Sequence, residues 1–201
     1  MNCQTKHPYR TLAIVGLLLI VAACGSSPAV RYYSLEAIDA RYDGEVEVVA
    51  GLGVGPLRMP EYLAKTKIVT RRGGAEMIVD DFNRWAEPVE DEVHRIVAAN
   101  LDGLLEDTVV VAFPYRHYSD LRGQVVGRID RFDADKDGQV VLLVQWGIVT
   151  HEQDFVVVPR RASYEAQAGT AGDYTAIATA MSQVLADFSR DIEREYRSAF
   201  P

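Results

Sequence analysis

The chain has 201 residues, with 21 Lys and Arg against 29 Asp and Glu, and 48% of its residues are hydrophobic. This is ordinary globular composition, and the length suits one domain with its own hydrophobic core. The formal net charge of -8 argues against a nucleic-acid-binding protein, because contacts to phosphates require clustered Lys and Arg.

The first 23 residues have the organisation of a cleaved signal peptide. Lys6 and Arg10 precede an apolar run over residues 12–23, which is shorter than the about 20 helical residues that cross a bilayer. The run ends in Val21-Ala22-Ala23-Cys24, and a polar stretch over residues 25–28 follows. This tetrad resembles the lipobox of bacterial lipoproteins. The alternatives are an ordinary signal followed by a chance cysteine, and a buried helix.

A lipobox implies that the peptide is cut before Cys24, that the thiol receives a diacylglyceryl group, and that the new amino terminus is usually acylated as well. Two or three acyl chains make a stable membrane anchor. Cys3 leaves with the signal peptide, so the mature chain has one cysteine, and that cysteine is lipidated. This excludes a disulfide, a thiolate metal site and a cysteine nucleophile.

The residue after the lipidated cysteine indicates which membrane holds the protein. In the familiar Gram-negative sorting pattern, Asp at this position above all retains a lipoprotein at the inner membrane, and here the residue is Gly25. We therefore expect the periplasmic face of the outer membrane. Residues 24–30 form the lipidated linker, and the six residues from Gly25 to Val30 extend to at most about 20 Å. The domain over residues 31–201 must lie close to its membrane.

Beyond the linker, alternating and apolar runs predict a series of short strands. We expect Gly51, Gly53, Gly55 and Pro56 to end the second of them, and Pro60–Ala64 to form a loop or a single helical turn. In chain order, the expected strands are Arg31–Ala37, Glu45–Val54, Lys67–Thr70, Met77–Val79, Thr108–Phe113, Gln124–Phe132, Gln139–Val149 and Phe155–Tyr164.

Two segments have the apolar spacing of long helices. Pro88 suits the first helical position of a helix that reaches about Leu105, and the acidic residues of Glu87–Glu92 complement its dipole. The second helix presents apolar residues from Tyr174 to Tyr196, with Asp173 placed as its N-cap. We expect a single α+β domain in which two long helices pack on one face of a largely antiparallel sheet.

Three patterns resemble ligand-binding motifs without meeting their requirements. In the glycine-rich stretch Gly51–Gly55, the third glycine of a dinucleotide fingerprint would fall on Pro56, and no helix follows. Asp133–Gly138 matches half of a calcium loop, but Val144 occupies the position of the bidentate Glu, so a solvated hairpin turn is expected. The histidines of the mature chain are dispersed and are expected to be exposed or half-buried; they are His94, His117 and His151. The sequence predicts no catalytic residue, cofactor or metal ligand.

Two segments combine proline with a large aromatic residue. One is Pro60-Glu61-Tyr62-Leu63, and the other is Arg84-Trp85-Ala86-Glu87-Pro88. Their aromatic side chains either pack the ends of strands and helices onto the core or contact a partner, and composition favours packing. The candidate partner or core residues are Pro60, Tyr62, Leu63 and Trp85.

The order of these features resembles a known family. After Cys24 come Tyr32-Tyr33-Ser34-Leu35, Gly53-Val54-Gly55-Pro56, the two proline–aromatic segments, Asn100-Leu101, and the stretch from Phe132 to Trp146. Nearly the whole mature chain is thus similar to the ABC-type transport auxiliary lipoproteins, the paraquat-inducible protein C family. The resemblance implies an outer-membrane lipoprotein that faces the periplasm and partners MCE-domain (mammalian cell entry) proteins, which carry lipids between membranes. It implies an accessory role without catalysis. The one functional residue that the resemblance assigns is the acylated cysteine, which corresponds to Cys24.

Three hypotheses about function therefore stand. The first is a tethered docking subunit of a lipid-transport machine, whose affinity benefits from the shared membrane. The second is a module that itself holds an acyl chain, which requires an apolar cavity between helices and sheet. The third is an envelope hydrolase, for which the sequence holds no motif. Whether the protein forms a homo-oligomer is left open.

The anchor can be tested at its cysteine. The variant Cys24→Ser lacks the thiol that accepts the lipid, so we expect a soluble or unprocessed periplasmic protein with an intact domain and no transport function. Membrane fractionation in high salt measures this. Retention of the variant in the outer-membrane fraction would show that the anchor lies elsewhere.

Overall fold

The computed structural model describes residues 28–38, 50–115, 121–150, 152–169 and 172–201. The expected signal peptide, Cys24 and the expected start of the second strand at Glu45 lie outside these residues. The elements are, in chain order, β1 Arg31–Tyr33, β2 Ala50–Arg58, β3 Lys67–Gly73, β4 Glu76–Trp85, α2 Val89–Leu104, β5 Thr108–Ala112, β6 Leu121–Asp135, β7 Gln139–Val149, β8 Phe155–Gln167 and α3 Tyr174–Ala199.

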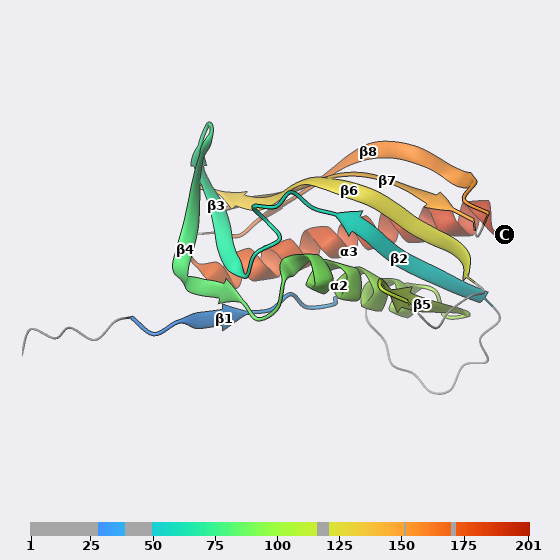
Figure 1. Ribbon diagram of the computed structural model, residues 1–201, viewed down its shortest axis with the longest axis horizontal. Helices are drawn as coiled ribbons and strands as arrows, with labels where there is room; N and C mark the ends of the chain where they lie inside the picture. Colours follow the sequence, from blue (N-terminus) through green and yellow to red (C-terminus); the bar gives the residue numbers. More distant parts are fainter. Residues whose placement is uncertain (1–27, 39–49, 116–120, 151, 170–171) are drawn as a thin grey trace, which may run out of the picture.

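All eight described strands belong to one sheet, which is organised around β6. One edge of β6 pairs with β2 along its first half and with β3 at Ala134 and Asp135, and its other edge pairs with β7. Strand β8 extends the sheet beyond β7, and β4 and β1 extend it beyond β3. The long strand β6 therefore connects the two halves of the sheet (Figure 1).

The expectation of a largely antiparallel sheet is wrong, because the sheet is mixed. The pairs β3–β4, β6–β7 and β7–β8 are antiparallel. The pairs β1–β4, β2–β5, β2–β6 and β3–β6 are parallel. Short loops join the antiparallel pairs, whereas long connections, including α2, separate the strands that pair in parallel. The parallel pairs join strands that are distant in sequence, so no local sequence pattern predicts them.

The expected end of the second strand at its glycines is also wrong, because β2 continues to Arg58. This strand lies between β5 and β6, so its neighbours approach from both sides. A Cβ atom at Gly53 would stand 2.9 Å from Leu121 Cδ1, and one at Gly55 would stand 2.7 Å from Phe113 Cβ. The glycines permit this close packing around β2.

The two long helices form as predicted and lie on the same side of the sheet (Figure 1). Helix α3 contacts β6, β7 and β8, while α2 contacts β2, β5 and α3. The Asp173 carboxylate accepts hydrogen bonds from the backbone N–H groups of Thr175 and Ala176, both at 3.0 Å, as expected of an N-cap. The largest fully buried side chains are Trp146, Phe132, Phe188, Leu52, Leu57, Ile68, Ile96, Leu101, Leu105, Ile129, Leu142 and Ile148.

The burial of Trp85 leads to a stability prediction. This side chain is 3% exposed within the core, whereas Tyr32 on the adjacent strand β1 is 64% exposed. Truncation of a buried large aromatic costs about 3–5 kcal/mol, so we expect Trp85→Ala to lower the free energy of unfolding by that amount. Urea denaturation measures it, with Tyr32→Ala as the control. Equal effects of the two truncations would contradict the assignment of Trp85 to the core.

Candidate functional site

The proline–aromatic residues singled out in the sequence occupy two different environments. Leu63 and Trp85 are buried in the core, while Pro60 and Tyr62 are partly exposed in the connection between β2 and β3. The backbone N–H of Leu63 donates to the Pro60 carbonyl at 2.9 Å, which closes a turn there. Among these residues, the tertiary structure thus leaves Pro60 and Tyr62 at the surface.

Tyr62 belongs to a cluster of polar side chains around a buried carboxylate. Asp133 is 0% exposed, which contradicts the expected solvated turn at this position. Its two oxygens accept hydrogen bonds from Arg71 Nε at 3.0 and 2.9 Å, and one also accepts from Arg131 Nε at 2.8 Å. The Tyr62 hydroxyl donates to Asp133 at 3.3 Å and accepts from Arg71 Nη2 at 3.2 Å.

This cluster connects β3, β6 and the turn before β3 by charge-assisted hydrogen bonds. Burial raises the pKa of the Tyr62 hydroxyl, and the hydrogen bond to Asp133 raises the pKa of the Arg71 guanidinium. The two arginines satisfy the buried carboxylate, so Asp133 is a structural residue. Within Asp133–Gly138, the solvated turn is formed by Lys136 and Asp137, whose side chains make an exposed ion pair at 2.6 Å.

A second polar group joins the N-terminal segment to both helices. The expected strand Arg31–Ala37 is a strand only to Tyr33, and residues 34–38 continue as an irregular segment, here called the strap. The Leu35 N–H donates to Glu92 Oε1 on α2 at 2.7 Å, and the Ser34 hydroxyl donates to the same oxygen at 2.5 Å. The Glu36 N–H donates to the Ser182 hydroxyl on α3 at 3.0 Å.

The last bond of the strap runs from the Ile38 N–H to Asn100 Oδ1 at 2.8 Å. These bonds give partners to backbone groups that no sheet neighbour pairs, and they account for polar side chains buried on apolar helix faces. Glu92 lies in the first turn of α2, but its 0% exposure shows that it does more than complement the helix dipole. Burial raises the pKa of its carboxyl group.

His94 is buried, so the expectation of an exposed or half-buried histidine is wrong at this position. It is 2% exposed, and its Nε2 accepts the Leu57 N–H at 2.8 Å, which places the proton of the neutral ring on Nδ1. Its ring packs edge-on to Phe113 with the centroids 5.7 Å apart. Desolvation lowers the pKa of the imidazole. His117 and His151 lie outside the described residues.

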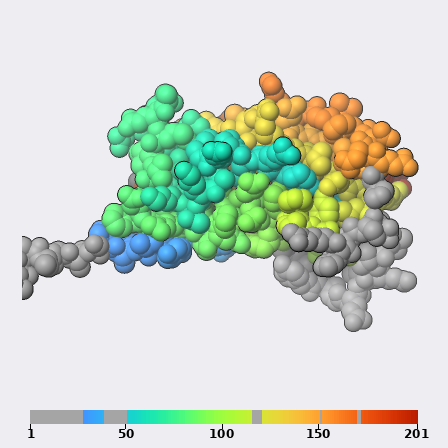
Figure 2. All heavy atoms as spheres, viewed as in Figure 1, coloured from blue at the N-terminus to red at the C-terminus, as the bar shows by residue number. Residues whose placement is uncertain are grey.

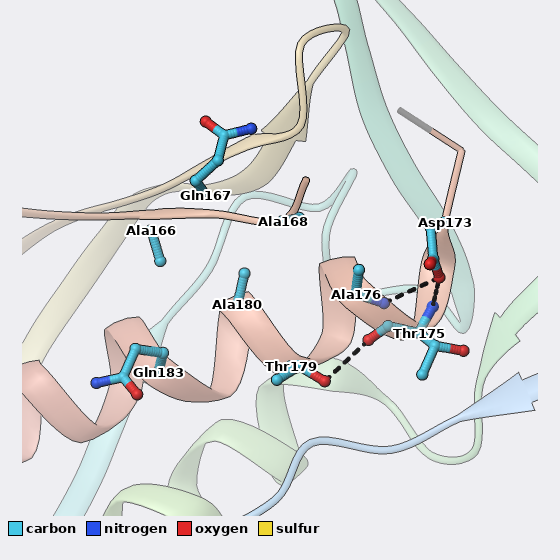
Figure 3. A pocket seen from close by; sticks show the side chains of 9 residues that line it. All are labelled: Ala166, Gln167, Ala168, Asp173, Thr175, Ala176, Thr179, Ala180 and Gln183. Atoms are coloured by element: carbon cyan, nitrogen blue, oxygen red, sulfur yellow. Dashed lines mark hydrogen bonds between the residues drawn. The ribbon is translucent and has the colours of Figure 1, made fainter. Parts of the chain in front are cut away.

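A shallow hollow of about 470 Å³ lies between the end of β8 and the first turns of α3 (Figure 3). Its apolar lining consists of small side chains, and the two helix N–H groups that could bind an anion already donate to Asp173. The lining residues are Ala166, Gln167, Ala168, Asp173, Thr175, Ala176, Thr179, Ala180 and Gln183. Among the described residues, no three His, Cys, Asp or Glu side chains are placed to bind a metal ion.

The family model of the ABC-type transport auxiliary lipoprotein component matches residues 33–193. The chain belongs to this family. The match confirms the resemblance inferred from the order of the sequence features. Curated relatives named intermembrane transport lipoprotein PqiC, from Escherichia coli K12 and Shigella flexneri, are each 25% identical over 144 residues. The alignments cover 71% of this chain and 75% of each relative.

Solved structures share the fold of this family member. The crystal structure of an uncharacterised protein matches with a TM-score of 0.70 at 23% identity, and covers 84% of this chain and 99% of that one. The crystal structure of a Xanthomonas campestris protein matches with a TM-score of 0.66 at 16% identity, and covers 84% and 98%. In the described part of the chain, neither helix has the length and apolar character needed to span a membrane.

Sequence reasoning missed the polar groups that organise this family member. Arg131 and Asp133 lie two residues apart on β6, so they share a face of that strand, but Arg71 comes from β3 and no sequence spacing brings it to them. Asn100 and Ser182 carried a weak signal, because each lies among apolar residues on a helix face. A polar residue in such a position requires a hydrogen-bonding partner, which here is the strap.

The lowered pKa of His94 predicts a pH dependence of stability. The folded state keeps the ring neutral, whereas an unfolded histidine binds a proton near pH 6.5. The contribution of His94 to stability is therefore present above about pH 6.5 and is lost as the pH falls below it, by up to about 1.4 kcal/mol per pH unit.

We expect His94→Gln to be less stable than the wild type at pH 7.5, but to lose less stability between pH 7.5 and 5.5. Urea denaturation at both values measures the two losses. The comparison removes the effects of carboxyl groups such as Glu92, which are present in both proteins. Equal losses in the two proteins would contradict the assignment.

Proposed function

We propose that this protein is a lipid-anchored periplasmic accessory lipoprotein of an MCE-type intermembrane lipid-transport system, which docks or assembles the transport proteins and catalyses no reaction. Membership of the transport auxiliary family and the names of the PqiC relatives support the transport role. The lipobox at Cys24 and the following Gly25 support attachment to the periplasmic face of the outer membrane. We keep residues 1–23 as the signal peptide, 24–30 as the linker and 31–201 as the domain.

The observation that carries the docking role is the placement of exposed apolar residues relative to the anchored end. Among the described strands, β8 pairs only with β7, and its first residues include Phe155, Val156 and Val158, which are 50%, 40% and 73% exposed. This β8 patch lies at the end of the molecule where α3 terminates, opposite β1 and the N-terminal segment (Figures 1 and 2). Exposed apolar residues on an unpaired strand edge favour contact with another protein.

The alternative, a module that itself holds an acyl chain, needs apolar space between helices and sheet. Large side chains fill this layer along α3. The rings of Trp146 and Phe188 meet edge-on with centroids 5.5 Å apart, and Tyr164 packs on Phe188 at 5.6 Å. The hollow beside α3 is open, and alanines and polar side chains line it, which does not suit a buried lipid tail. These contacts favour docking over lipid storage. Neither the family description nor the relatives' names supply a reaction, so the hydrolase hypothesis gains no support.

The docking role is tested by co-purification of the full lipoprotein with the periplasmic MCE-domain protein of the same organism. We expect the wild type to bind and Val158→Asp to bind about thirtyfold more weakly, the loss typical of a residue that contributes 2 kcal/mol to an interface. Because Val158 is 73% exposed, the variant should keep its fold.

The matched control is Val79→Asp, the same substitution at a valine of β4 that is 52% exposed and belongs to neither end strand β8 nor its neighbour β7. Absence of binding by the wild type would overturn the docking role, and equal binding by all three proteins would overturn the β8 patch as its surface. Stoichiometric lipid in the purified protein, detected by mass spectrometry, would instead support the lipid-holding alternative.

A further inference from the structure

A second group of exposed apolar residues lies at the N-terminal end of the domain. Val30, Tyr32 and Phe82 are 40%, 64% and 42% exposed. Tyr32 belongs to β1, and Val30 is the residue directly before that strand. Phe82 belongs to β4, the strand with which β1 pairs. We call these three residues the β1–β4 patch. The proposed docking role does not use it.

Strand register places the patch on one surface. Tyr32 pairs with Arg84, and Tyr33 pairs with the buried Trp85. Because side chains alternate along a strand, Tyr32 and Arg84 point away from the face that packs on the core. Continuing the register by two residues places Val30 beside Phe82, on the same side as Tyr32. The exposed apolar side chains are therefore neighbours.

Two arginines flank the patch without carboxylate partners among the described residues. Neither Arg31 nor Arg84 forms an ion pair there; Arg84 Nε donates only to the Asp81 carbonyl at 3.3 Å. The nearby carboxylates are already engaged, because Asp81 pairs with Lys67 at 2.6 Å and Asp80 accepts from the Tyr174 hydroxyl at 2.8 Å. Tyrosine and phenylalanine beside arginines that form no ion pair within the described part of the chain suit a bilayer interface, where rings enter the headgroup layer and guanidinium groups contact phosphates.

The length of the linker identifies the surface that the patch meets. Val30 is six residues from Cys24, so even a fully extended linker keeps the patch within about 20 Å of an acylated cysteine. That cysteine must lie at the headgroup level, since its acyl chains occupy the bilayer. The strap then fixes this end of the chain to both helices.

We propose that the β1–β4 patch, with Arg31 and Arg84, rests in the headgroup layer of the membrane that holds Cys24, so that the domain has one fixed orientation with β1 and β4 toward the bilayer. The inference rests on the lipid anchor of the proposed function and goes beyond it, because a tether alone would leave the domain free to turn. It places the β8 patch away from the membrane, on the side open to a periplasmic partner.

The test uses the full lipoprotein, reconstituted in vesicles of phosphatidylethanolamine and phosphatidylglycerol, with a fluorophore at a single introduced cysteine. The variants are Tyr32→Cys and Phe82→Cys at the patch and Val158→Cys at the opposite end. Cys3 leaves with the signal peptide and the Cys24 thiol carries the lipid, so the label reaches only the new cysteine. Mass spectrometry first establishes acylation, and the emission of the buried Trp85 and Trp146 establishes that each variant is folded.

We expect lipid-borne nitroxide to quench the label at positions 32 and 82 and aqueous iodide to lose its quenching there when vesicles are present. The label at position 158 should respond to iodide alone. An acylated protein in which all three labels stay accessible to iodide would overturn the oriented contact and leave the anchor intact. An unacylated Cys24 would overturn both the lipid anchor and this orientation of the domain. The docking role would still be judged separately, by the co-purification with the MCE-domain protein.

Discussion

The constraint on which this structure depends is the need to pair the backbone of the strap. Leu35 is buried, so the polar backbone around it loses contact with water and requires partners. Because β1 ends at Tyr33, sheet pairing cannot supply them, and side chains on the two helices do so instead. A polar group buried without a partner costs about 1–3 kcal/mol, which explains why Glu92, Asn100 and Ser182 occupy positions that apolar residues would otherwise fill.

This pairing has a mechanical consequence for a tethered protein. The strap near the N-terminal end of the domain is bound to α2 through Glu92 and to α3 through Ser182. Since α2 and α3 pack on each other and on the sheet, these bonds join the strap to the body of the domain. If the proposed function holds, the bound strap suits a subunit that must hold its partner at a defined distance from the membrane.

The long strand β6 and the cluster around Asp133 perform a similar task within the sheet. Strands β2 and β3 follow one another along a single edge of β6, and the chain between them leaves the sheet at Pro60–Tyr62. Arg71, Arg131 and Tyr62 bind the buried carboxylate at the point where β3 joins β6. An unpaired charge at such a site is strongly destabilising, so the buried Asp133 carboxylate depends on its two arginine partners.

Local patterns in the sequence determined much of this protein. The lipobox and the order of the family motifs identified the lipoprotein class, and the apolar spacing of Pro88–Leu105 and Tyr174–Tyr196 predicted both helices, because helix periodicity and N-cap chemistry act over a few residues. Most strands were also located, since alternation is local. The tertiary structure alone decided the mixed sheet, the burial of Asp133 and His94, and the pairing of the strap. Each of these depends on groups far apart in the chain, such as Ser34 with Glu92 or Arg71 with Asp133, and hydrogen bonding between them leaves no periodic trace in the sequence.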